Sequence, residues 1–288
     1  MNQLTIPRMH GLGNTMLLVD ADRLAGHDVA MVARRWCALA EVDALMLHDR
    51  SPRMSIRNAD GSDAELCGNG LRCLARLGVD EGWYASPVRI QSPAGTHEAL
   101  VDEHGAVRVS LPAPRFGSRV VRAYPSALQG QDTEDDACIT LEVDGHRLDL
   151  HLVSTGNPHA VIPCGDAAAL EVIELIGPVL ETHPAFPGGI NVHLAYVADR
   201  ERIQLRSWER GVGPTRACAT GATAAMAAMV RIDLVDDRVE VEMPGGVLQV
   251  QWEEDDSTIW NTGPAEYMDP VAVELGEDTR CDDAADLD

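Results

Sequence analysis

The chain has 288 residues, of which 45% are hydrophobic, a composition typical of one large globular domain or two modest ones. Its formal net charge of −23 argues against partners such as nucleic acid or an anionic membrane surface. All 23 basic residues are arginines. Without a lysine amine, the chain cannot hold pyridoxal phosphate or any other carbonyl compound as a Schiff base.

The cysteines point to a reducing compartment. They number seven, an odd count, and their spacing is irregular. The N-terminal sequence MNQLTIPRMHGLGN lacks the basic and apolar regions of a signal peptide. We therefore expect no disulfide framework and a cytoplasmic location. The sequence has no Cys-x-x-Cys, no His-Glu-x-x-His and no tight His/Cys cluster, so we expect no metal site. No apolar stretch is long enough to span a bilayer.

Short runs of alternating apolar and polar residues, bounded by turn residues, predict strands of an antiparallel sheet. In chain order they are residues 54–58, 87–92, 106–112, 138–143, 147–153, 202–208, 238–244 and 247–252. Helical patterns occur at about 28–40, 68–78, 167–182 and 219–231. The helices after Cys67 and Cys218 are apolar nearly all round, which predicts that both lie in a core.

The order of these elements indicates two similar halves. Asn58 lies nine residues before Cys67, and Glu209 lies nine residues before Cys218. Each segment runs from a strand through a glycine-bearing loop to a cysteine and an apolar helix. The sequence GLGN at 11–14 has a counterpart in STGNPH at 154–159. We therefore predict an α+β fold of two similar halves related by a pseudo-two-fold, each a mostly antiparallel sheet wrapped around a central buried helix.

The position of Cys67 and Cys218 suggests acid–base chemistry. The positive end of a helix lowers the pKa of a thiol at its N-terminus, and the free N–H groups there can hold a carboxylate. Two such thiols, meeting between matched halves, could remove a proton from one face of a carbon and return one to the other face. This pattern favours inversion at an α-carbon. The remaining cysteines are interpreted as small buried hydrophobes or, for the last, as incidental: Cys37, Cys73, Cys138, Cys164 and Cys281.

Five blocks occur in order between about residues 8 and 267: MHGLGN, NADGSDAELCGNGLRC, STGNPHAV, NVHL and WERGVGPTRACATGA. They resemble the signature blocks of the diaminopimelate epimerases, pyridoxal-independent isomerases of lysine and peptidoglycan precursor synthesis. The resemblance implies that LL-diaminopimelate is converted to meso-diaminopimelate without a cofactor. It also implies a small amino-acid substrate as the ligand and a homodimer as the assembly.

The resemblance assigns the site residue by residue. Cys67 and Cys218 would be the acid/base pair, with His159 assisting their protonation and Glu209 in the same catalytic set. The reacting carboxylate would be held by Gly68, Asn69, Ala219 and Thr220. The distal amino-acid head would be bound by Asn14, Asn58, Asn157, Asn191, Glu209 and Arg210. In that group an arginine can pair with a carboxylate and a glutamate with an ammonium group.

The resemblance also sets the expected division of the chain. Residues 1–122 would form the N-terminal half and 123–262 the C-terminal half. A strand at 263–275 would return to the N-terminal half. The run from 276 to 288 is strongly acidic and is expected to be a disordered tail.

Several departures from the family's usual residues keep other functions open; they are Thr15, Met16, Glu41, Pro214 and Ala219. One alternative is a related cofactor-independent racemase of another amino acid, such as one with a cationic side chain that Glu41 would meet. A second is an isomerase of a carbon acid that is not an amino acid. A third is a non-catalytic binding protein on the same scaffold.

Overall fold

The computed structural model describes residues 3–64, 66–123, 137–143, 145–253, 258–276 and 279–280. The elements of the first part of the chain are β1 (Gln3–Gly11), β2 (Asn14–Asp20), η1 (Ala21–Leu24), α1 (Val29–Ala40), β3 (Ala44–His48), β4 (Ser55–Asn58), α2 (Gly68–Asp80), β5 (Val88–Ser92), β6 (Gly95–Val101), β7 (Ala106–Pro112) and β8 (Arg115–Phe116). They are followed by β9 (Cys138–Val143), β10 (His146–Ser154), β11 (Pro158–Cys164), η3 (Ala167–Val172), α3 (Ile173–Glu181), β12 (Asn191–Asp199), β13 (Arg202–Glu209), β14 (Gly213–Thr215), α4 (Ala219–Arg231), β15 (Arg238–Met243), β16 (Gly246–Trp252), β17 (Thr258–Pro264) and β18 (Glu266–Glu274).

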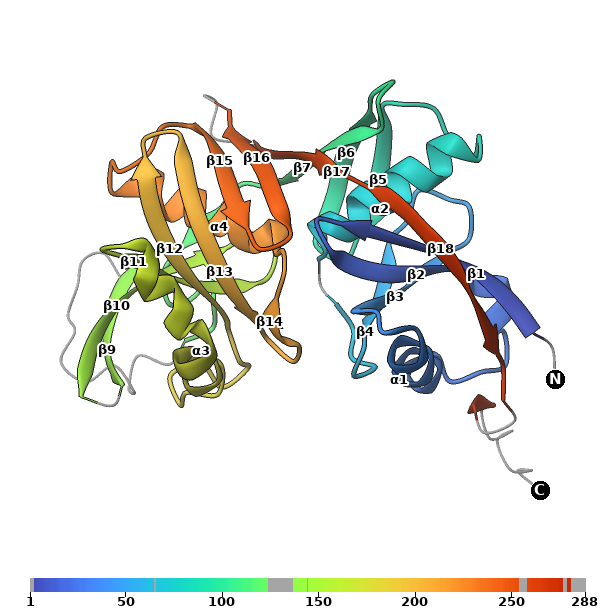
Figure 1. The fold of residues 1–288 in the computed structure, drawn as a ribbon, viewed down its shortest axis with the longest axis horizontal. Coiled ribbons are helices and arrows are strands. Elements are labelled where there is room, and N and C mark those ends of the chain that lie inside the picture. The colour runs from blue at the N-terminus through green and yellow to red at the C-terminus, as the bar shows by residue number, and fades with distance from the viewer. Residues whose placement is uncertain are drawn as a thin grey trace.

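The strands form two sheets. The smaller has the order β18-β1-β2-β3-β4. The larger has the order β5-β6-β7-β17-β16-β15-β13-β12-β11-β10-β8, with β14 paired to β13 and β9 paired to β10. The pairs β2–β3, β11–β12 and β13–β15 are parallel. The other named pairs are antiparallel, so the predicted mostly antiparallel α+β fold is confirmed. The larger sheet passes from one lobe to the other where β17 pairs with β7 (Figure 1).

The two halves have the same internal order. In the first, β1 pairs with β2, α1 crosses over to the parallel strand β3, and β3 pairs with β4 before α2 begins. In the second, β10 pairs with β11, the segment with α3 crosses over to the parallel strand β12, and β12 pairs with β13 before α4. Asn58 and Glu209 thus end equivalent strands, β4 and β13. The predicted duplication is confirmed.

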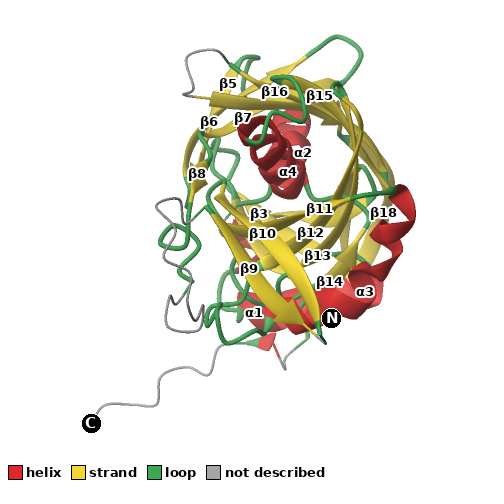
Figure 2. Ribbon diagram, turned by 90° about the vertical axis from the view of Figure 1, so that its left-hand side faces the viewer, coloured by secondary structure: helices red, strands yellow, loops and turns green. Residues whose placement is uncertain are grey.

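Helices α2 and α4 lie inside the curved sheets of the two lobes (Figures 1 and 2). Most side chains of α4 are those of alanine, glycine and threonine, and all its residues from Ala219 to Met229 are buried. A helix with no polar face needs apolar neighbours on every side, which the surrounding strands supply. The prediction that both helices lie in cores is therefore correct.

The two halves are joined by more than the chain. Leu12, in the turn between β1 and β2, packs in the core around α4. Strand β17 pairs with β16 on one side and with β7 on the other. Strand β18 then returns to pair with β1. The division at 122/123 stays a prediction, but β8 pairs with β10, and Val121 packs in the core beside β10–β12.

The disordered tail expected at 276–288 stays a prediction, and Thr279 within it contacts the segment before α1. Thr279 is buried, its carbonyl accepts the Asp28 N–H at 2.8 Å, and its Oγ1 lies 2.8 Å from His27 Nδ1. These contacts hold Thr279 against the segment that precedes α1. Residues 277–278 and 281–288, with Cys281, lie outside the described residues.

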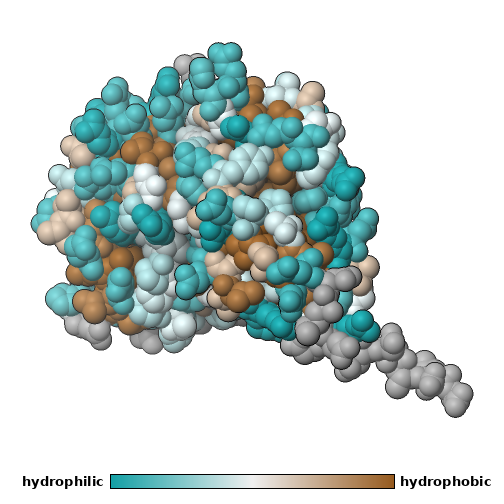
Figure 3. Space-filling model, turned by 45° about the vertical axis from the view of Figure 1, so that its right-hand side comes forward, coloured by the Kyte–Doolittle hydropathy of each residue, from teal (hydrophilic) through white to brown (hydrophobic). Residues whose placement is uncertain are grey.

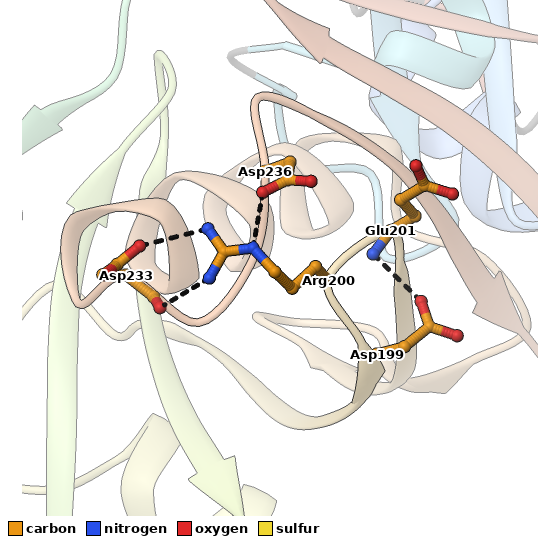
Figure 4. A network of polar contacts seen from close by, with 5 residues as sticks. All are labelled: Asp199, Arg200, Glu201, Asp233 and Asp236. Carbon is orange, nitrogen blue, oxygen red and sulfur yellow. Dashed lines mark hydrogen bonds and ion pairs between the residues drawn. The ribbon is translucent and has the colours of Figure 1, made fainter.

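The surface is rich in charge. Figure 3 shows hydrophilic residues distributed over one face, with smaller hydrophobic areas between them. Arg200 illustrates the ion pairing: its Nε donates to Asp236 at 2.7 Å and its Nη2 to Asp233 at 3.1 Å (Figure 4). This arginine ties the turn after β12 to the segment after α4, although an exposed ion pair of this kind adds little stability. None of the described helices is long and apolar enough to cross a membrane.

Candidate active site

Cys67 and Cys218 are the N-cap residues of α2 and α4. Both have extended backbone conformations, and each sulfur accepts a hydrogen bond from the helix that follows. Gly70 N–H donates to Cys67 Sγ at 3.2 Å, and Gly221 N–H donates to Cys218 Sγ at 3.3 Å. A cysteine in this position faces the unpaired N–H groups of the first helical turn. The two cysteines, whose sequence contexts are similar, therefore also have the same local geometry.

The two helix starts meet. A Cβ atom at Gly68 would lie 2.8 Å from the Cβ of Ala219, so no side chain fits between them. Asn69 links the two halves at this point, because its Nδ2 donates to Ala217 O at 3.0 Å and its Oδ1 accepts from Arg72 at 2.6 Å. Asn261 of β17 holds the other helix, since its Nδ2 donates to Ala219 O at 3.1 Å. The first turns of α2 and α4 are thus fixed opposite each other.

A small cavity of about 60 Å³ lies at this junction. Both cysteines line it, one from each half, and the glycine of one helix start and the alanine of the other form part of its wall. The residues that line it are Asn14, Asp43, Ala44, Ile56, Asn58, Ala64, Leu66, Cys67, Gly68, Asn69, Glu209, Val212, Thr215, Cys218, Ala219 and Thr220. All the residues expected to hold the reacting carboxylate are among them.

A second cavity, of about 590 Å³, adjoins the first and is lined by Asn58, Asn157, Asn191, Glu209 and Arg210 among others. Asn58 and Glu209 line both cavities. Of the six residues expected to bind the distal head, only Asn14 lies away from the larger cavity. The predicted residues are therefore brought together, divided between a thiol cavity and a wider distal cavity.

Asp43 is a carboxylate that the sequence reasoning did not assign. Its Oδ2 accepts hydrogen bonds from Thr15 N at 2.7 Å, Thr15 Oγ1 at 3.0 Å and Asn14 Nδ2 at 3.3 Å. Because a carboxylate only accepts, Asn14 must turn its amide nitrogen toward Asp43. The Oδ1 of Asn14 then faces Cys67, whose thiol donates to it at 3.8 Å. Asp43 therefore sets the orientation of Asn14 beside the first cysteine.

Burial governs the acidity of the thiols. It raises the pKa of Cys67 to about 11, opposed by the Gly70 N–H and by the charge of Arg72 and reinforced by Glu209. Burial, reinforced by Glu209, raises the pKa of Cys218 well above its ordinary value. The first-turn N–H groups do lower both pKa values, as expected, but desolvation outweighs their contribution.

Glu209 stands beside the second thiol. Its Oε1 accepts from Thr215 Oγ1 at 2.6 Å, and Cys218 lies within hydrogen-bonding reach of the same carboxyl. Burial raises the pKa of Glu209 from its ordinary value, while the contacts to Thr215 and Cys218 lower it. The glutamate is thus placed to influence the protonation of Cys218, and its charge also acts on Cys67.

His159 is buried and lies behind the site. Its Nε2 is 2.8 Å from Asn157 Oδ1 and 3.1 Å from Thr155 Oγ1, and its Nδ1 is 2.9 Å from His193 Nε2. Both ring nitrogens are therefore engaged with partners other than a thiol. Burial lowers the pKa of His159 well below its ordinary value, so the ring is neutral. This geometry connects His159 to Asn157 and gives it no direct contact with either cysteine.

The distal residues are held by a frame that the sequence reasoning also missed. Glu181, at the end of α3, accepts from Trp208 Nε1 at 2.6 Å and from Gly211 N at 2.8 Å. Asn191 Oδ1 accepts from the Arg210 N–H at 3.0 Å, and its Nδ2 donates to Pro158 O at 2.7 Å. The chain on both sides of Arg210 is therefore fixed to α3 and β12.

The departures noted in the sequence lie mostly outside the cavities. Glu41 ends α1 in a left-handed conformation, is exposed, and lines neither cavity. Met16 is buried in the first core, and Pro214 is exposed on β14. Thr15 binds Asp43 behind the wall. Only Ala219 reaches a cavity surface.

Comparison with known proteins bears on the same residues. A family model described as diaminopimelate epimerase matches residues 7–116 and 151–268. The chain is 37% identical over 272 residues to the diaminopimelate epimerase of Pseudomonas syringae, covering 91% of this chain and 96% of that relative. It is 38% identical over 274 residues to the diaminopimelate epimerase of Azotobacter vinelandii, with the same shares covered.

Solved structures share the fold at low sequence identity. A hydroxyproline epimerase from Agrobacterium vitis, with bound trans-4-OH-L-proline, has a TM-score of 0.64 and 14% identity, covering 95% of this chain and 91% of that chain. A phenazine biosynthesis protein from Bacillus anthracis has a TM-score of 0.62 and 17% identity, covering 96% of this chain and 100% of that chain. These likenesses support the two-lobed architecture.

Proposed function

Because the chain belongs to the diaminopimelate epimerase family, we propose that it is an isomerase that inverts the α-carbon of LL-diaminopimelate to give the meso compound. The observation that supports this most directly is the pair of cysteine N-caps, one from each half, lining one small cavity. Two equivalent groups on opposite sides of a carbon serve the reaction in both directions.

We propose that Cys67 and Cys218 are the acid/base pair. One sulfur, as thiolate, takes the α-proton, and the electron pair of the broken C–H bond moves into the carboxylate as an enolate. The other thiol gives its proton to the opposite face, so the protonation states of the two cysteines are exchanged at the end of each turnover. The first-turn N–H groups at Gly68, Asn69, Ala219 and Thr220 would hold the carboxylate and stabilise its added charge.

The division of the site supports a substrate with two amino-acid heads. The thiol cavity holds both cysteines and the first turns of α2 and α4, and the distal cavity next to it carries Arg210 for a carboxylate and Glu209, at the junction, for an ammonium group. A single-headed amino acid has no second carboxylate or ammonium group with which to reach these residues. The exposed position of Glu41 gives no support to a cationic side chain bound there.

Isotope exchange at the α-carbon tests the proposal. The protein would be given LL-diaminopimelate in heavy water without added cofactor, beside lysine, proline and other single-headed amino acids. We expect exchange and inversion with diaminopimelate alone, lost in Cys67→Ala and in Cys218→Ala but kept in Cys164→Ala, a thiol outside both cavities. Exchange only with another amino acid would overturn the substrate, and no exchange at all would overturn the chemistry.

Two further proposals concern the setting of the reaction. A pair of catalytic thiols works only when both are reduced, which favours the cytoplasm. The family also suggests a homodimer, and light scattering coupled to size-exclusion chromatography would test it directly. A mass equal to one chain at micromolar concentration would count against the dimer.

A further inference from the structure

His193 has no role in the proposal above, yet it is fully buried against the site. It comes from β12 and lies between β11 and β13, the strands that carry His159 and Ser207. His193 Nε2 is 2.9 Å from His159 Nδ1, and His193 Nδ1 is 2.9 Å from Ser207 Oγ. A hydrogen-bond chain therefore crosses three neighbouring strands and ends at Asn157, on the wall of the distal cavity.

The chain has one direction. A neutral imidazole has one donor and one acceptor nitrogen, and an amide oxygen only accepts. Because Asn157 Oδ1 faces His159 Nε2, that nitrogen must carry the hydrogen, which makes His159 Nδ1 an acceptor. His193 Nε2 must then donate, its Nδ1 must accept, and the Ser207 hydroxyl must supply the last hydrogen. Burial lowers the pKa of His193 to about 3, so the ring remains neutral as this scheme requires.

The far end of the chain lies near a thiol. With its oxygen turned inward to His159, Asn157 points its Nδ2 at Thr220 Oγ1, 3.5 Å away. Thr220 Oγ1 is in turn 3.5 Å from Cys218 Sγ. The orientation of one amide thus decides whether the distal cavity meets N–H donors or a carbonyl oxygen from Asn157.

We propose that Ser207, His193 and His159 form a positioning chain that locks Asn157 with its amide hydrogens toward the cavity, so that it binds a carboxylate oxygen of the substrate. The inference rests on the proposed function for the identity of that carboxylate. His193 and Ser207 are positioning residues, because neither lines a cavity and both act through Asn157. If either histidine alone changed tautomer, two donors or two acceptors would face each other in a buried place, so the two rings keep matching tautomers.

Packing keeps the central ring in place. A Cβ atom at Gly221 would lie 2.2 Å from His193 Cε1, so the first turn of α4 rests directly on the imidazole. Gly221 also donates its N–H to Cys218. The same helical turn therefore contacts the middle of the chain and the catalytic thiol, and the absence of a side chain at Gly221 makes both contacts fit.

Histidine tautomers give a test that needs no substrate. Two-bond proton–nitrogen NMR spectra of the wild-type protein labelled with ¹⁵N-histidine distinguish the Nε2–H form from the Nδ1–H form, and His159→Gln and His193→Gln spectra assign the two signals. We expect both residues to be neutral Nε2–H tautomers at pH 7. Finding both as Nδ1–H, or either as a cation, would overturn the proposal, whatever the substrate proves to be.

Kinetics test the consequence for binding. His193→Leu keeps much of the volume but removes both hydrogen bonds, and Ser207→Ala removes only the last donor. We expect KM for diaminopimelate to rise about tenfold in the first and several-fold in the second, with kcat changed less. His193→Gln, which can donate and accept, should recover most of the loss. The control is Leu194→Val, on the opposite face of β12. An unchanged KM in His193→Leu, or a rise in KM in Leu194→Val as large as that in His193→Leu, would overturn the proposal.

Discussion

At the scale of single residues, the contact between Gly68 and Ala219 is the most demanding feature of the site. The two positions are so close that a methyl group at residue 68 would push the helix starts apart. We expect Gly68→Ala to reduce kcat/KM about 100-fold, because a displacement of about 1 Å between catalytic groups is enough for such a loss. The activity assay would be accompanied by a melting curve to show that the variant folds.

The control for this prediction is built into the pair. Ala219→Gly should have close to normal activity. The double variant Gly68→Ala, Ala219→Gly should be at least tenfold more active than Gly68→Ala, because the double variant, like the wild type, has only one methyl group at this contact. A double variant no better than Gly68→Ala would show that the glycine serves some purpose other than close approach.

The acidity of the thiols makes a second prediction. Since burial raises the pKa of Cys67 to about 11, alkylation by iodoacetamide should become about tenfold faster with each pH unit between 7 and 10, without a plateau. Glu209 raises the pKa of both thiols, so Glu209→Gln should move this profile to lower pH while epimerase activity falls. Rates of inactivation measured across pH would check it. A plateau near pH 8 in the wild type would contradict the buried, protonated resting state.

Which site residues could be read from the sequence follows from how each is placed. Cys67, Cys218 and their neighbours belong to short local motifs at helix starts, and such motifs determine their own geometry. Asp43, Glu181 and His193 reach the site through strand pairing and helix packing between distant segments. The residues around Asp43 and Glu181 do not distinguish them from ordinary buried or surface residues, and the block NVHL contains His193 without indicating what its side chain contacts.

At the scale of elements, helix α3 connects the fold to substrate selection. Glu181 receives two hydrogen bonds from the segment that presents Glu209 and Arg210. Glu181→Ala should free that segment and raise KM for diaminopimelate about tenfold, with a smaller effect on kcat, since the thiols are untouched. Glu174→Ala is the matched control, because it removes the same charge from an exposed position on the same helix. Equal effects of the two variants on KM would contradict a positioning role.

The strands divide into those that a pattern reveals and those that it does not. Most of the predicted strands, among them β7 and β15, alternate between buried and less buried residues, whereas β10 ends in a run of buried residues. Strands β3 and β12 have runs of consecutive buried residues instead, as do β2 and β11. These four strands make two of the three parallel pairs and are covered on both faces, so their sequences show no period of two. The helices were easier to predict, because their capping residues and apolar spacing lie within short stretches of sequence.

At the scale of the whole molecule, the charge of −23 predicts a dependence on salt. Like charges on a compact surface repel one another, and the screening length falls from about 10 Å at 0.1 M salt to about 3 Å at 1 M. We expect Tm to rise by several degrees between 0.05 M and 1 M potassium chloride. Sucrose at equal osmolality serves as a control for effects other than screening. A flat melting temperature across the series would contradict this prediction.

The pairing of β18 with β1 and of β17 with β7 also determines when the protein can become active during its synthesis. The N-terminal segment is synthesised first, but its strands β1 and β7 pair with β18 and β17, which are synthesised near the end of translation. Folding of the first lobe therefore finishes only when almost the whole chain has emerged. Asn261, which holds the start of α4, arrives in the same late segment. A nascent chain that already holds both cysteines thus still lacks the frame that would make them a catalytic pair until residues 258–274 have emerged.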